Sequence, residues 1–323
     1  MSRKIISVIR SPFQLLCLCE FLFQNLIDDY ECHVILNTEK DKLQCNNIKN
    51  FFKINFSSIN VVNSISLVLK LKFFSKNCSQ LILGHLFDNI SIISSKLISY
   101  NDLIILDDGV SSIAIRDYIL FGKSPYGNSL GLKQQIFDFF IKTPKTFSLF
   151  TIFYEHLELN DNIKLIPNDF ECLTSNIKFE KKDSLVYFIG GTEVEDGLIS
   201  KINFLNFFQN LKEKNIIYFP HRREELEKLK LLEPLDIQSC ISNIPFELFL
   251  LKSKKSPKKI IGFSSSALFT SRSILKNDFH KVDFYYIELN DSVAEKKLDD
   301  HLIRIQDFYK TIGYNKIIFD AKQ

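Results

Sequence analysis

The sequence predicts an α/β protein of two domains. Apolar runs of strand length alternate with longer runs of helical periodicity, a pattern typical of β-α units around parallel sheets. The length of 323 residues suits two domains or one large one. A polar stretch, NIKFEKKDS at 176–184, is the best linker candidate. We therefore expect an N-terminal domain over residues 1–178 and a C-terminal domain over 179–323.

The N-terminal half opens with a β-α unit. Lys4–Ile9 is an apolar run of strand type, and Ser11 and Pro12 predict the N-cap and first residue of a helix. The next elements expected are strands at Cys32–Asn37, Ser58–Val62, Leu81–Leu83, Asp102–Leu106 and Phe147–Tyr154, a helix at Glu39–Phe52, and further strand or helix runs at Leu67–Phe74 and Ser91–Tyr100. The glycine-rich stretch 123–133, followed by a helix at 134–142, is interpreted as a loop over a cleft or as a surface connection.

The C-terminal half repeats this alternation. The predicted strands are Leu185–Ile189, Ile216–Phe219, Lys259–Phe263 and Asp283–Leu289, and the predicted helices are Gly197–Lys212, Glu224–Leu232, one opened by Pro245, one opened by the serines at 264–266, and Asp299–Ile312. Pro220 ends the second strand, because proline lacks the N–H that a central strand needs. The last helix is expected in the C-terminal domain, with packing back on the N-terminal domain as the alternative.

Charge and cysteine content exclude several classes of protein. A formal net charge of +3, with lysines and acids interspersed, argues against a nucleic-acid-binding protein. The seven cysteines are odd in number and include no CxxC pair, which predicts reduced, mostly buried thiols rather than a disulfide framework or a zinc module. The sequence contains no signal-peptide core and no apolar run of membrane-spanning length, so a cytoplasmic protein is expected.

Two carboxylates and a glycine follow the strand that ends at Leu106. Asp107 and Asp108 lie at a strand's carboxyl end, where open α/β sheets bind ligands, and Gly109 permits a tight turn. The motif presents an acid to a crevice, or it is a common turn with one acid capping the helix near Ser111.

Glycines and a histidine follow the first two strands of the C-terminal half. Gly190 and Gly191 allow backbone N–H groups to approach a phosphate or sugar, or form a plain turn. His221, with Arg222 and Arg223 after it, is well placed to meet an anion at a strand end. The alternative is a solvated basic turn.

Two more polar motifs precede helices. Glu247 lies in a first helical turn, where it suits the helix dipole or accepts hydrogen bonds from ribose hydroxyls. Ser264, Ser265 and Ser266 open a helix and offer N–H groups and hydroxyls as a metal-free phosphate cradle, or one of them is simply the N-cap. The basic run KSKKSPKK at 252–259 is a solvated loop or a contact for an anionic membrane surface.

The four motifs DDG, PHRRE, PFE and GFSSSALF stand in an order that resembles the bacterial sialyltransferases of the lipooligosaccharide and polysialic acid groups. Those enzymes carry a D/E-D/E-G motif, a His-Pro motif and a paired-serine motif. The opening SVIRSPFQLLCLCEFL, with Gln14 in a Pro-x-Gln-Leu-Leu signature, is similar to their first strand and helix. The resemblance spans most of the chain and departs where His221 is followed by Arg222 instead of proline.

The resemblance implies a fold of the GT-B class, with two Rossmann-like domains facing across a substrate cleft. It implies that the N-terminal domain takes the acceptor, with Gln14, Asp108 and Gly109 on that side. The C-terminal domain is implied to take the CMP-sugar, through Gly190, Gly191, Arg222, Glu247, Ser264, Ser265 and Ser266.

The resemblance also implies individual roles. Asp107 matches the catalytic base, and His221 matches the general acid or phosphate ligand. Ser265 and Ser266 match the phosphate-binding pair, and Glu247 matches the acid that holds the ribose. The family works without a metal, and the remaining histidines show no metal-ligand spacing. Among them, His85 is expected to be a buried structural residue or to line the acceptor side.

The expected function is therefore that of an inverting, metal-independent sialyltransferase, which moves N-acetylneuraminate from its CMP donor to a galactoside of a bacterial surface glycan. The alternative donor is a related CMP-nonulosonate or another nucleotide sugar on the same fold. The alternative from another class is a non-catalytic glycan- or nucleotide-binding protein. The expected location is the cytoplasm, including the cytoplasmic face of the inner membrane if the acceptor is lipid-linked.

Overall fold

The structure is a computed structural model of the 323-residue chain, and it describes residues 4–61, 78–121, 146–157, 163–180, 184–276, 281–289, 294, 298 and 300–319. The chain divides into two compact units: unit 1 comprises Met1–Asn176 and Asn243–Pro245, and unit 2 comprises Ile177–Ser242 and Phe246–Gln323. The predicted run at 67–74, the loop at 123–133 and the helix at 134–142 lie outside the described residues.

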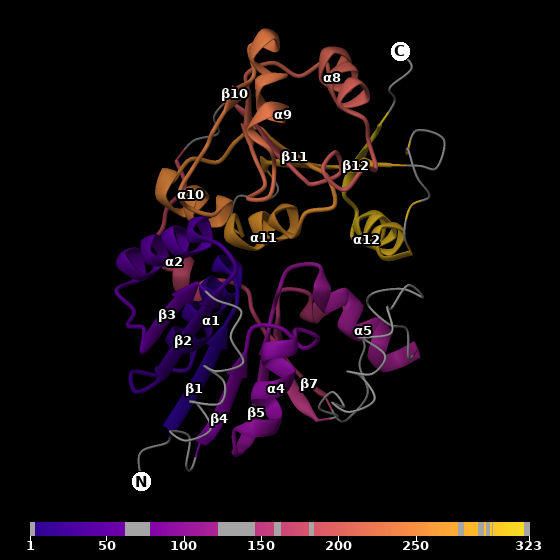
Figure 1. The fold of residues 1–323 in the computed structure, drawn as a ribbon. Helices are drawn as coiled ribbons and strands as arrows, with labels where there is room; N and C mark the ends of the chain where they lie inside the picture. Colours follow the sequence, from indigo (N-terminus) through magenta and orange to yellow (C-terminus); the bar gives the residue numbers. More distant parts are fainter. Residues whose placement is uncertain are drawn as a thin grey trace. The chain divides into compact units, whose positions relative to one another are not determined.

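Unit 1 is a parallel sheet with helices between its strands (Figure 1). Its described elements are β1 (Lys4–Ile9), α1 (Pro12–Gln24), β2 (Glu31–Leu36), α2 (Glu39–Phe52), β3 (Ser58–Val61), β4 (Cys78–Leu83), α4 (Asn89–Leu97), β5 (Tyr100–Leu106), α5 (Ser111–Phe121), β6 (Phe147–Thr151), η2 (Tyr154–His156), β7 (Ile163–Pro167) and α7 (Glu171–Thr174). The N-cap predicted for α1 is confirmed, because Ser11 Oγ accepts from Gln14 N at 3.2 Å.

The strands of unit 1 stand in the order β3-β2-β1-β4-β5-β6-β7, and the described pairs are parallel. The chain therefore winds from β1 to one edge of the sheet and from β4 to the other. The reversal between β1 and β4 is the topological switch point, where doubly wound sheets leave a crevice at the carboxyl ends of their strands.

Unit 2 has the same plan. Its described elements are β8 (Val186–Ile189), α8 (Lys201–Asn210), β9 (Ile216–Phe219), α9 (Leu226–Lys230), η3 (Glu233–Leu235), β10 (Gln238–Ser239), α10 (Phe246–Ser253), β11 (Lys259–Gly262), α11 (Ser266–Ile274), β12 (Asp283–Glu288), α12 (Asp300–Thr311) and β13 (Asn315–Ile318). The described strands are parallel in the order β10-β9-β8-β11-β12-β13, so the switch point lies between β8 and β11.

Aromatic side chains fill the core of unit 2. Phe188 of β8 is fully buried and stacks on Tyr218 of β9 with ring centroids 5.4 Å apart. Phe204 and Phe208 of α8 contact these rings edge-on or tilted. Such buried ring pairs add to the hydrophobic stabilisation of the sheet that carries the site.

The predicted strand and helix alternation is confirmed in both halves, but β7, β10 and β13 were not predicted. Each of these is short, and all three lie at sheet edges, where exposed polar residues weaken the apolar pattern. Because β13 follows α12, the helix expected to be the last element is not the last. In α12, Tyr309 donates to Ser265 O at 2.5 Å and stacks on Tyr314 at 5.4 Å, so this helix packs within unit 2.

The seven cysteines are free thiols, and five of them are buried, as predicted. In the described part of the chain, no helix is both long enough and apolar enough to cross a membrane.

The buried carboxylate of Glu20 in α1 connects this helix to α7 within unit 1. Its Oε1 accepts from Cys172 N at 2.9 Å and its Oε2 from Leu173 N at 2.8 Å, at the start of α7. We expect Glu20→Ala to lower the free energy of unfolding by about 1.5–3 kcal/mol per lost charged hydrogen bond, and Glu20→Gln, which keeps one acceptor, to cost less. Urea denaturation measures both, and an unchanged midpoint in Glu20→Ala would contradict this connection.

Candidate functional site

Asp107 is fully buried at the carboxyl end of β5. Its Oδ1 accepts from Ser112 Oγ at 2.5 Å, and its Oδ2 accepts from Ile152 N at 2.5 Å and Asn168 Nδ2 at 3.4 Å. Burial raises the pKa of Asp107 to about 6, against the opposing effect of these hydrogen bonds. The carboxylate thus joins β5 to the ends of β6 and β7, and this burial disfavours the role of catalytic base that the sequence predicts for it.

Asp108 is the more exposed of the two acids that follow β5. Its side chain is 31% exposed, its Oδ1 accepts from Ser11 Oγ at 3.3 Å, and its Oδ2 lies 3.6 Å from His85 Nε2. His85 Nδ1 accepts from Phe87 N at 2.9 Å, so the neutral ring carries its proton on Nε2, facing Asp108. The structure therefore brings a partly exposed carboxylate and a histidine together beside the switch point of unit 1.

The other residues predicted on the acceptor side differ in their surroundings. Gly109 adopts the left-handed region at φ 67°, which explains the glycine at this turn. Gln14 is buried, and its Oε1 accepts from Arg10 N at 2.7 Å. It fills the space that Gly84 leaves, because a Cβ there would collide with the Gln14 amide. Gln14 thus packs between the residues that follow β1 and β4 at the switch point, and its burial disfavours direct contact with an acceptor.

Carboxylates occupy the space over the two glycines that follow β8. A Cβ on Gly190 would collide with the Glu224 carboxylate, and one on Gly191 would collide with the Glu193 carboxylate. A phosphate approaching this backbone would meet two acids. The arrangement therefore disfavours the phosphate contact predicted at Gly190 and Gly191, and assigns the glycines instead to making room for carboxylates.

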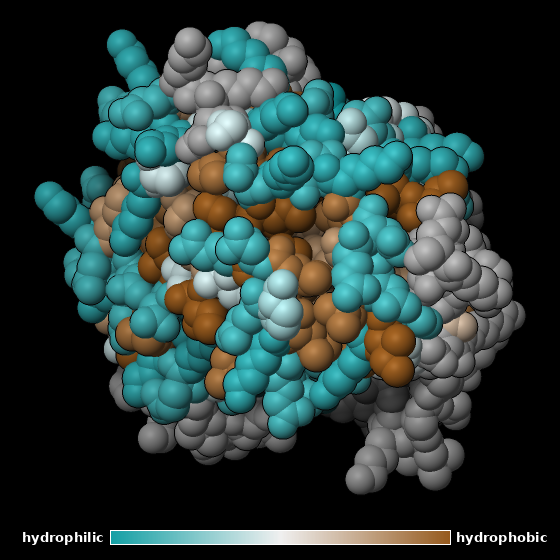
Figure 2. Space-filling model, turned by 90° about the horizontal axis from the view of Figure 1, so that it is seen from above, coloured by the Kyte–Doolittle hydropathy of each residue, from teal (hydrophilic) through white to brown (hydrophobic). Residues whose placement is uncertain are grey.

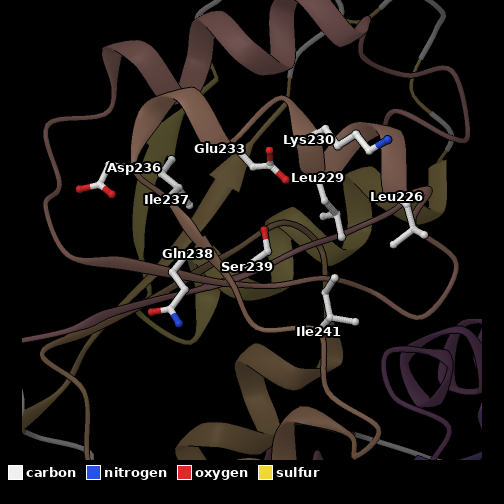
Figure 3. A pocket seen from close by; sticks show the side chains of 9 residues that line it. All are labelled: Leu226, Leu229, Lys230, Glu233, Asp236, Ile237, Gln238, Ser239 and Ile241. Carbon is white, nitrogen blue, oxygen red and sulfur yellow. The ribbon is translucent and has the colours of Figure 1, made fainter.

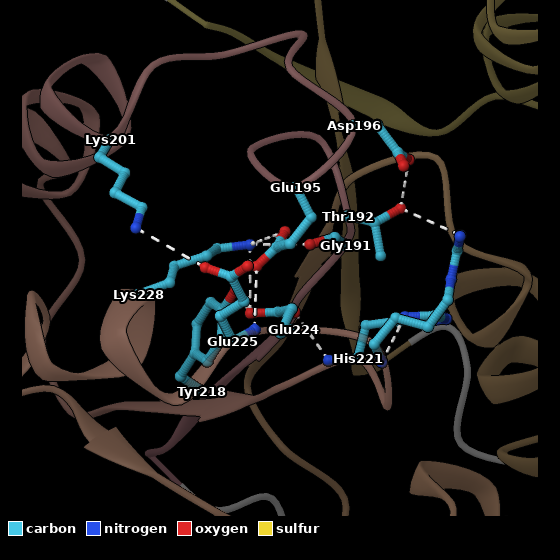
Figure 4. Close-up of polar contacts among 11 residues, drawn as sticks. Gly191, Thr192, Glu195, Asp196, Lys201, Tyr218, His221, Glu224, Glu225 and Lys228 are labelled. Atoms are coloured by element: carbon cyan, nitrogen blue, oxygen red, sulfur yellow. Dashed lines mark hydrogen bonds and ion pairs between the residues drawn. The ribbon is translucent and has the colours of Figure 1, made fainter. Parts of the chain in front are cut away.

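The ammonium group of Lys228 lies between the carboxylates of Glu195 and Glu224 (Figure 4). Its side chain is 1% exposed, and its Nζ donates to Gly191 O at 2.8 Å and lies 3.2 Å from both Glu195 Oε2 and Glu224 Oε2. It also lies 4.8 Å from the ring centroid of Phe204. The sequence pattern alone does not predict this cluster, although Glu224 stands three residues after His221 and Lys228 four residues after Glu224.

His221 is half-buried in the turn after β9. Its backbone N donates to Glu224 Oε1 at 2.7 Å, and Glu224 N donates to His221 O at 3.0 Å. Its Nδ1 accepts from Arg223 N at 3.2 Å, so the neutral ring carries its proton on Nε2. A ring in this state donates a hydrogen bond from Nε2, which suits an anionic oxygen.

The three serines stand at the end of β11 on the other side of the switch point of unit 2. All three are half-buried, Ser265 Oγ caps α11 by accepting from Ala267 N at 3.3 Å, and Ser266 is the first helical residue. One serine is therefore the N-cap, as one of the two interpretations predicts. The first-turn N–H groups of α11 and the remaining hydroxyls still suit a phosphate, which stays a prediction.

Among the remaining predicted donor-binding residues, Glu247 is buried, whereas Arg222 and its neighbour Arg223 are exposed. Glu247 is 5% exposed, its Oε1 accepts from Thr270 Oγ1 at 3.0 Å, and burial raises its pKa. It joins α10 to α11, and its contact with a ribose stays a prediction. Arg223 Nη2 donates to Thr192 Oγ1 at 3.2 Å, whereas Arg222 is exposed, and its predicted contact with the donor is likewise untested.

A separate pocket of about 490 Å³ lies beside α9 and β10 (Figure 3), and no predicted site residue lines it. Leu226 and Ile241 on its lining are 65% and 62% exposed. The face of the molecule in Figure 2 carries apolar side chains within a hydrophilic surround. Among the described residues, no group of three or more His, Cys, Asp and Glu side chains is arranged to hold a metal ion.

No family model matches the chain, and no curated protein matches its sequence. Among solved structures, the α/β-galactoside α-2,3-sialyltransferase of the luminous marine bacterium Photobacterium phosphoreum is similar with 14% identity and a TM-score of 0.56, over 100% of each chain. The 2,6-sialyltransferase of Photobacterium sp. JT-ISH-224, solved with CMP and lactose, has 14% identity and a TM-score of 0.53, over 99% of this chain and 79% of that one. A UDP-N-acetylglucosamine 2-epimerase has 9% identity and a TM-score of 0.53, over 100% and 85%.

These likenesses show the fold. The chain has two Rossmann-like parallel-sheet units of the GT-B class, as the sequence predicts. Because this fold carries both sialyltransferases and an epimerase, any argument about activity has to rest on the residues of this chain.

The burial of Asp107 predicts a pH dependence. Its pKa is about 6 in the fold against an ordinary value of 3.8, so its contribution to stability is present below about pH 4 and is lost as the pH rises to about 6. The loss is on the order of 3 kcal/mol. We expect the free energy of unfolding of Asp107→Asn, minus that of the wild type, to rise by this amount over that range.

Urea denaturation at a series of pH values measures this difference. Asp102→Asn, which changes an exposed acid on the same strand, is the matched control and should show no such rise. A difference for Asp107→Asn that does not vary with pH would show that this carboxyl is not buried as described.

Proposed function

We propose that the protein is an inverting glycosyltransferase, and specifically a sialyltransferase that uses CMP-N-acetylneuraminate and a galactoside acceptor. The observation that carries the proposal is the partly exposed Asp108 carboxylate beside His85, at the carboxyl end of β5. The ordered motifs of unit 2, with His221 as an Nε2 donor and the serines at the start of α11, support a CMP-sugar as donor.

Asp108 is the proposed general base, in place of Asp107. In the reaction, the acceptor hydroxyl oxygen forms a bond to the anomeric carbon of the donor, and its proton passes to an Asp108 oxygen. A carboxylate within hydrogen-bond reach of the acceptor is sufficient for this step. Ser11 and His85 each direct a donor group at Asp108, and these contacts fix the orientation of its carboxylate.

His221 and the serines are the proposed groups for the leaving CMP. The bond between the anomeric carbon and the phosphate oxygen breaks as the new glycosidic bond forms, and the phosphate gains negative charge. A hydrogen bond from His221 Nε2 and donors from Ser264, Ser266 and the first turn of α11 would stabilise this charge. Attack and departure on opposite sides of one carbon invert its configuration. The donors are all supplied by side chains and backbone, and we propose that no metal is required.

Other activities remain distinct alternatives. A related CMP-nonulosonate or another nucleotide sugar would use the same groups. The likeness to a UDP-N-acetylglucosamine 2-epimerase makes epimerisation a specific alternative, which predicts turnover of that nucleotide sugar without an acceptor. If the protein is a non-catalytic binding protein, we expect CMP-sugar binding without turnover. Such a protein would not require the Asp108 and His85 pair as a general base.

The first test compares neighbouring acids. In acceptor-dependent CMP release, Asp108→Asn is expected to lower kcat by about 10²- to 10⁴-fold, because it removes the general base. Asp107→Asn should keep much of the activity, since the amide oxygen can still accept from Ile152 N while the amide nitrogen can donate to Ser112 Oγ. Loss of activity in Asp107→Asn alone, with both variants folded, would return the base to Asp107.

The second test addresses the donor and the metal. We expect CMP release from CMP-N-acetylneuraminate with a panel of galactosides, unchanged by EDTA and lowered about 10²- to 10³-fold in His221→Ala, since one preorganised donor is lost. UDP-N-acetylglucosamine incubated alone should remain unchanged. Release that requires an added divalent cation would refute the metal-free proposal.

A further inference from the structure

We infer that Glu224 and Lys228 are positioning residues that hold His221 as a hydrogen-bond donor from Nε2. The inference deepens the proposed function and rests on it for the role of His221. It starts from the reciprocal bonds of the turn, in which Glu224 Oε1 accepts from His221 N at 2.7 Å and Glu224 N donates to His221 O at 3.0 Å. This turn also brings Arg223 N to within 3.2 Å of His221 Nδ1.

The Glu224 carboxylate is itself fixed by buried partners. Its side chain has no exposed surface, and its Oε2 accepts from Tyr218 Oη at 2.8 Å and lies 3.2 Å from Lys228 Nζ. Burial raises the pKa of Glu224, and the Lys228 charge is the largest influence that opposes this rise. Lys228 therefore favours the ionised form of Glu224, whose oxygens accept from both the turn and the tyrosine.

Lys228 connects this acid to the loop after β8. Its Nζ donates to Gly191 O at 2.8 Å and lies 3.2 Å from Glu195 Oε2. Glu195 Oε1 in turn accepts from Glu225 N at 3.1 Å, one residue beyond Glu224. The buried ammonium group of Lys228 thus contacts both the loop after β8 and the acid that closes the histidine turn, and the Glu195–Glu225 and Thr192–Arg223 hydrogen bonds link the same two loops.

Burial of the Lys228 ammonium group is costly unless the charge is fully paired. Removal of one partner leaves the remaining charges buried and unpaired. The presence of the buried ion pair therefore does not by itself show that the pair stabilises the fold. Its geometric consequence is specific, because the tautomer of His221 is set by Arg223 N, and Arg223 lies inside the turn that Glu224 closes. A displacement on the order of 1 Å at such a group can cost about 10²-fold in rate.

The experiment uses the full chain with three variants, namely Lys228→Met, Glu224→Gln and the double variant. Lys230→Met, which removes an exposed lysine of the same helix, is the matched control. The first readout is the ¹⁵N spectrum of histidine-labelled protein above pH 8, with the His221 signals assigned from His221→Asn. The second is kcat and KM for CMP release.

The wild type and Lys230→Met are expected to show the Nε2–H tautomer of His221. Lys228→Met should show mixed tautomers and a kcat lowered about 10²-fold, with a smaller change in KM. The double variant should regain the tautomer and part of kcat, because a neutral amide still accepts from His221 N and no longer needs the ammonium group. If Lys228→Met does not fold, the comparison of Glu224→Gln with the double variant carries the same test.

The outcomes separate this inference from the proposed function. A folded Lys228→Met with the tautomer and kcat of Lys230→Met overturns the positioning role, whatever the wild type catalyses. A changed tautomer in Lys228→Met, in a protein whose wild type releases no CMP from any donor, supports the positioning of His221 and refutes the transferase.

Discussion

The parallel order of the strands is the constraint on which the site depends. In both units every described strand runs the same way, so the carboxyl ends of the strands lie along one edge of the sheet. In each unit the strand order also reverses once, after the first strand and its two followers. Residues of the proposed site come from loops far apart in sequence, such as Ser11 after β1 and Asp108 after β5, and they meet because the topology brings these loops to one edge.

Within each unit, burial then distinguishes acids that are enclosed by the fold from acids that stay partly exposed. Asp107, Glu193, Glu224 and Glu247 are buried side chains whose pKa values burial raises. Each such group needs hydrogen bonds or a cation, and Lys228 meets that need for Glu224. The strands are therefore linked at their ends by polar contacts that also define the shape of the loops, while Asp108 keeps part of its surface exposed.

Much of the fold follows from the sequence, because strand length and helical period are local properties. The cap at Ser11, the stop at Pro220 and the turn at Gly109 each depend on one residue type and its neighbours. The site was predicted less completely. Whether Gly190 faces a ligand or the Glu224 carboxylate depends on a contact between separate loops, which no local pattern contains. The ion pair of Lys228 was visible only as a spacing of four residues, which is common on exposed helices.

The two adjacent acids show why a short motif does not by itself assign a role. Successive residues of an extended chain point in opposite directions, so Asp107 and Asp108 cannot both face the crevice. Asp107 points toward the ends of β6 and β7, where Ile152 N and Asn168 Nδ2 donate hydrogen bonds to its carboxylate. Asp108 points toward Ser11 and His85. The first acid fixes the strand end, and that fixed strand end is what orients the second. A resemblance matched letter by letter assigns the base to Asp107, whereas the hydrogen bonds within the fold bury Asp107 and leave Asp108 as the acid proposed for that role.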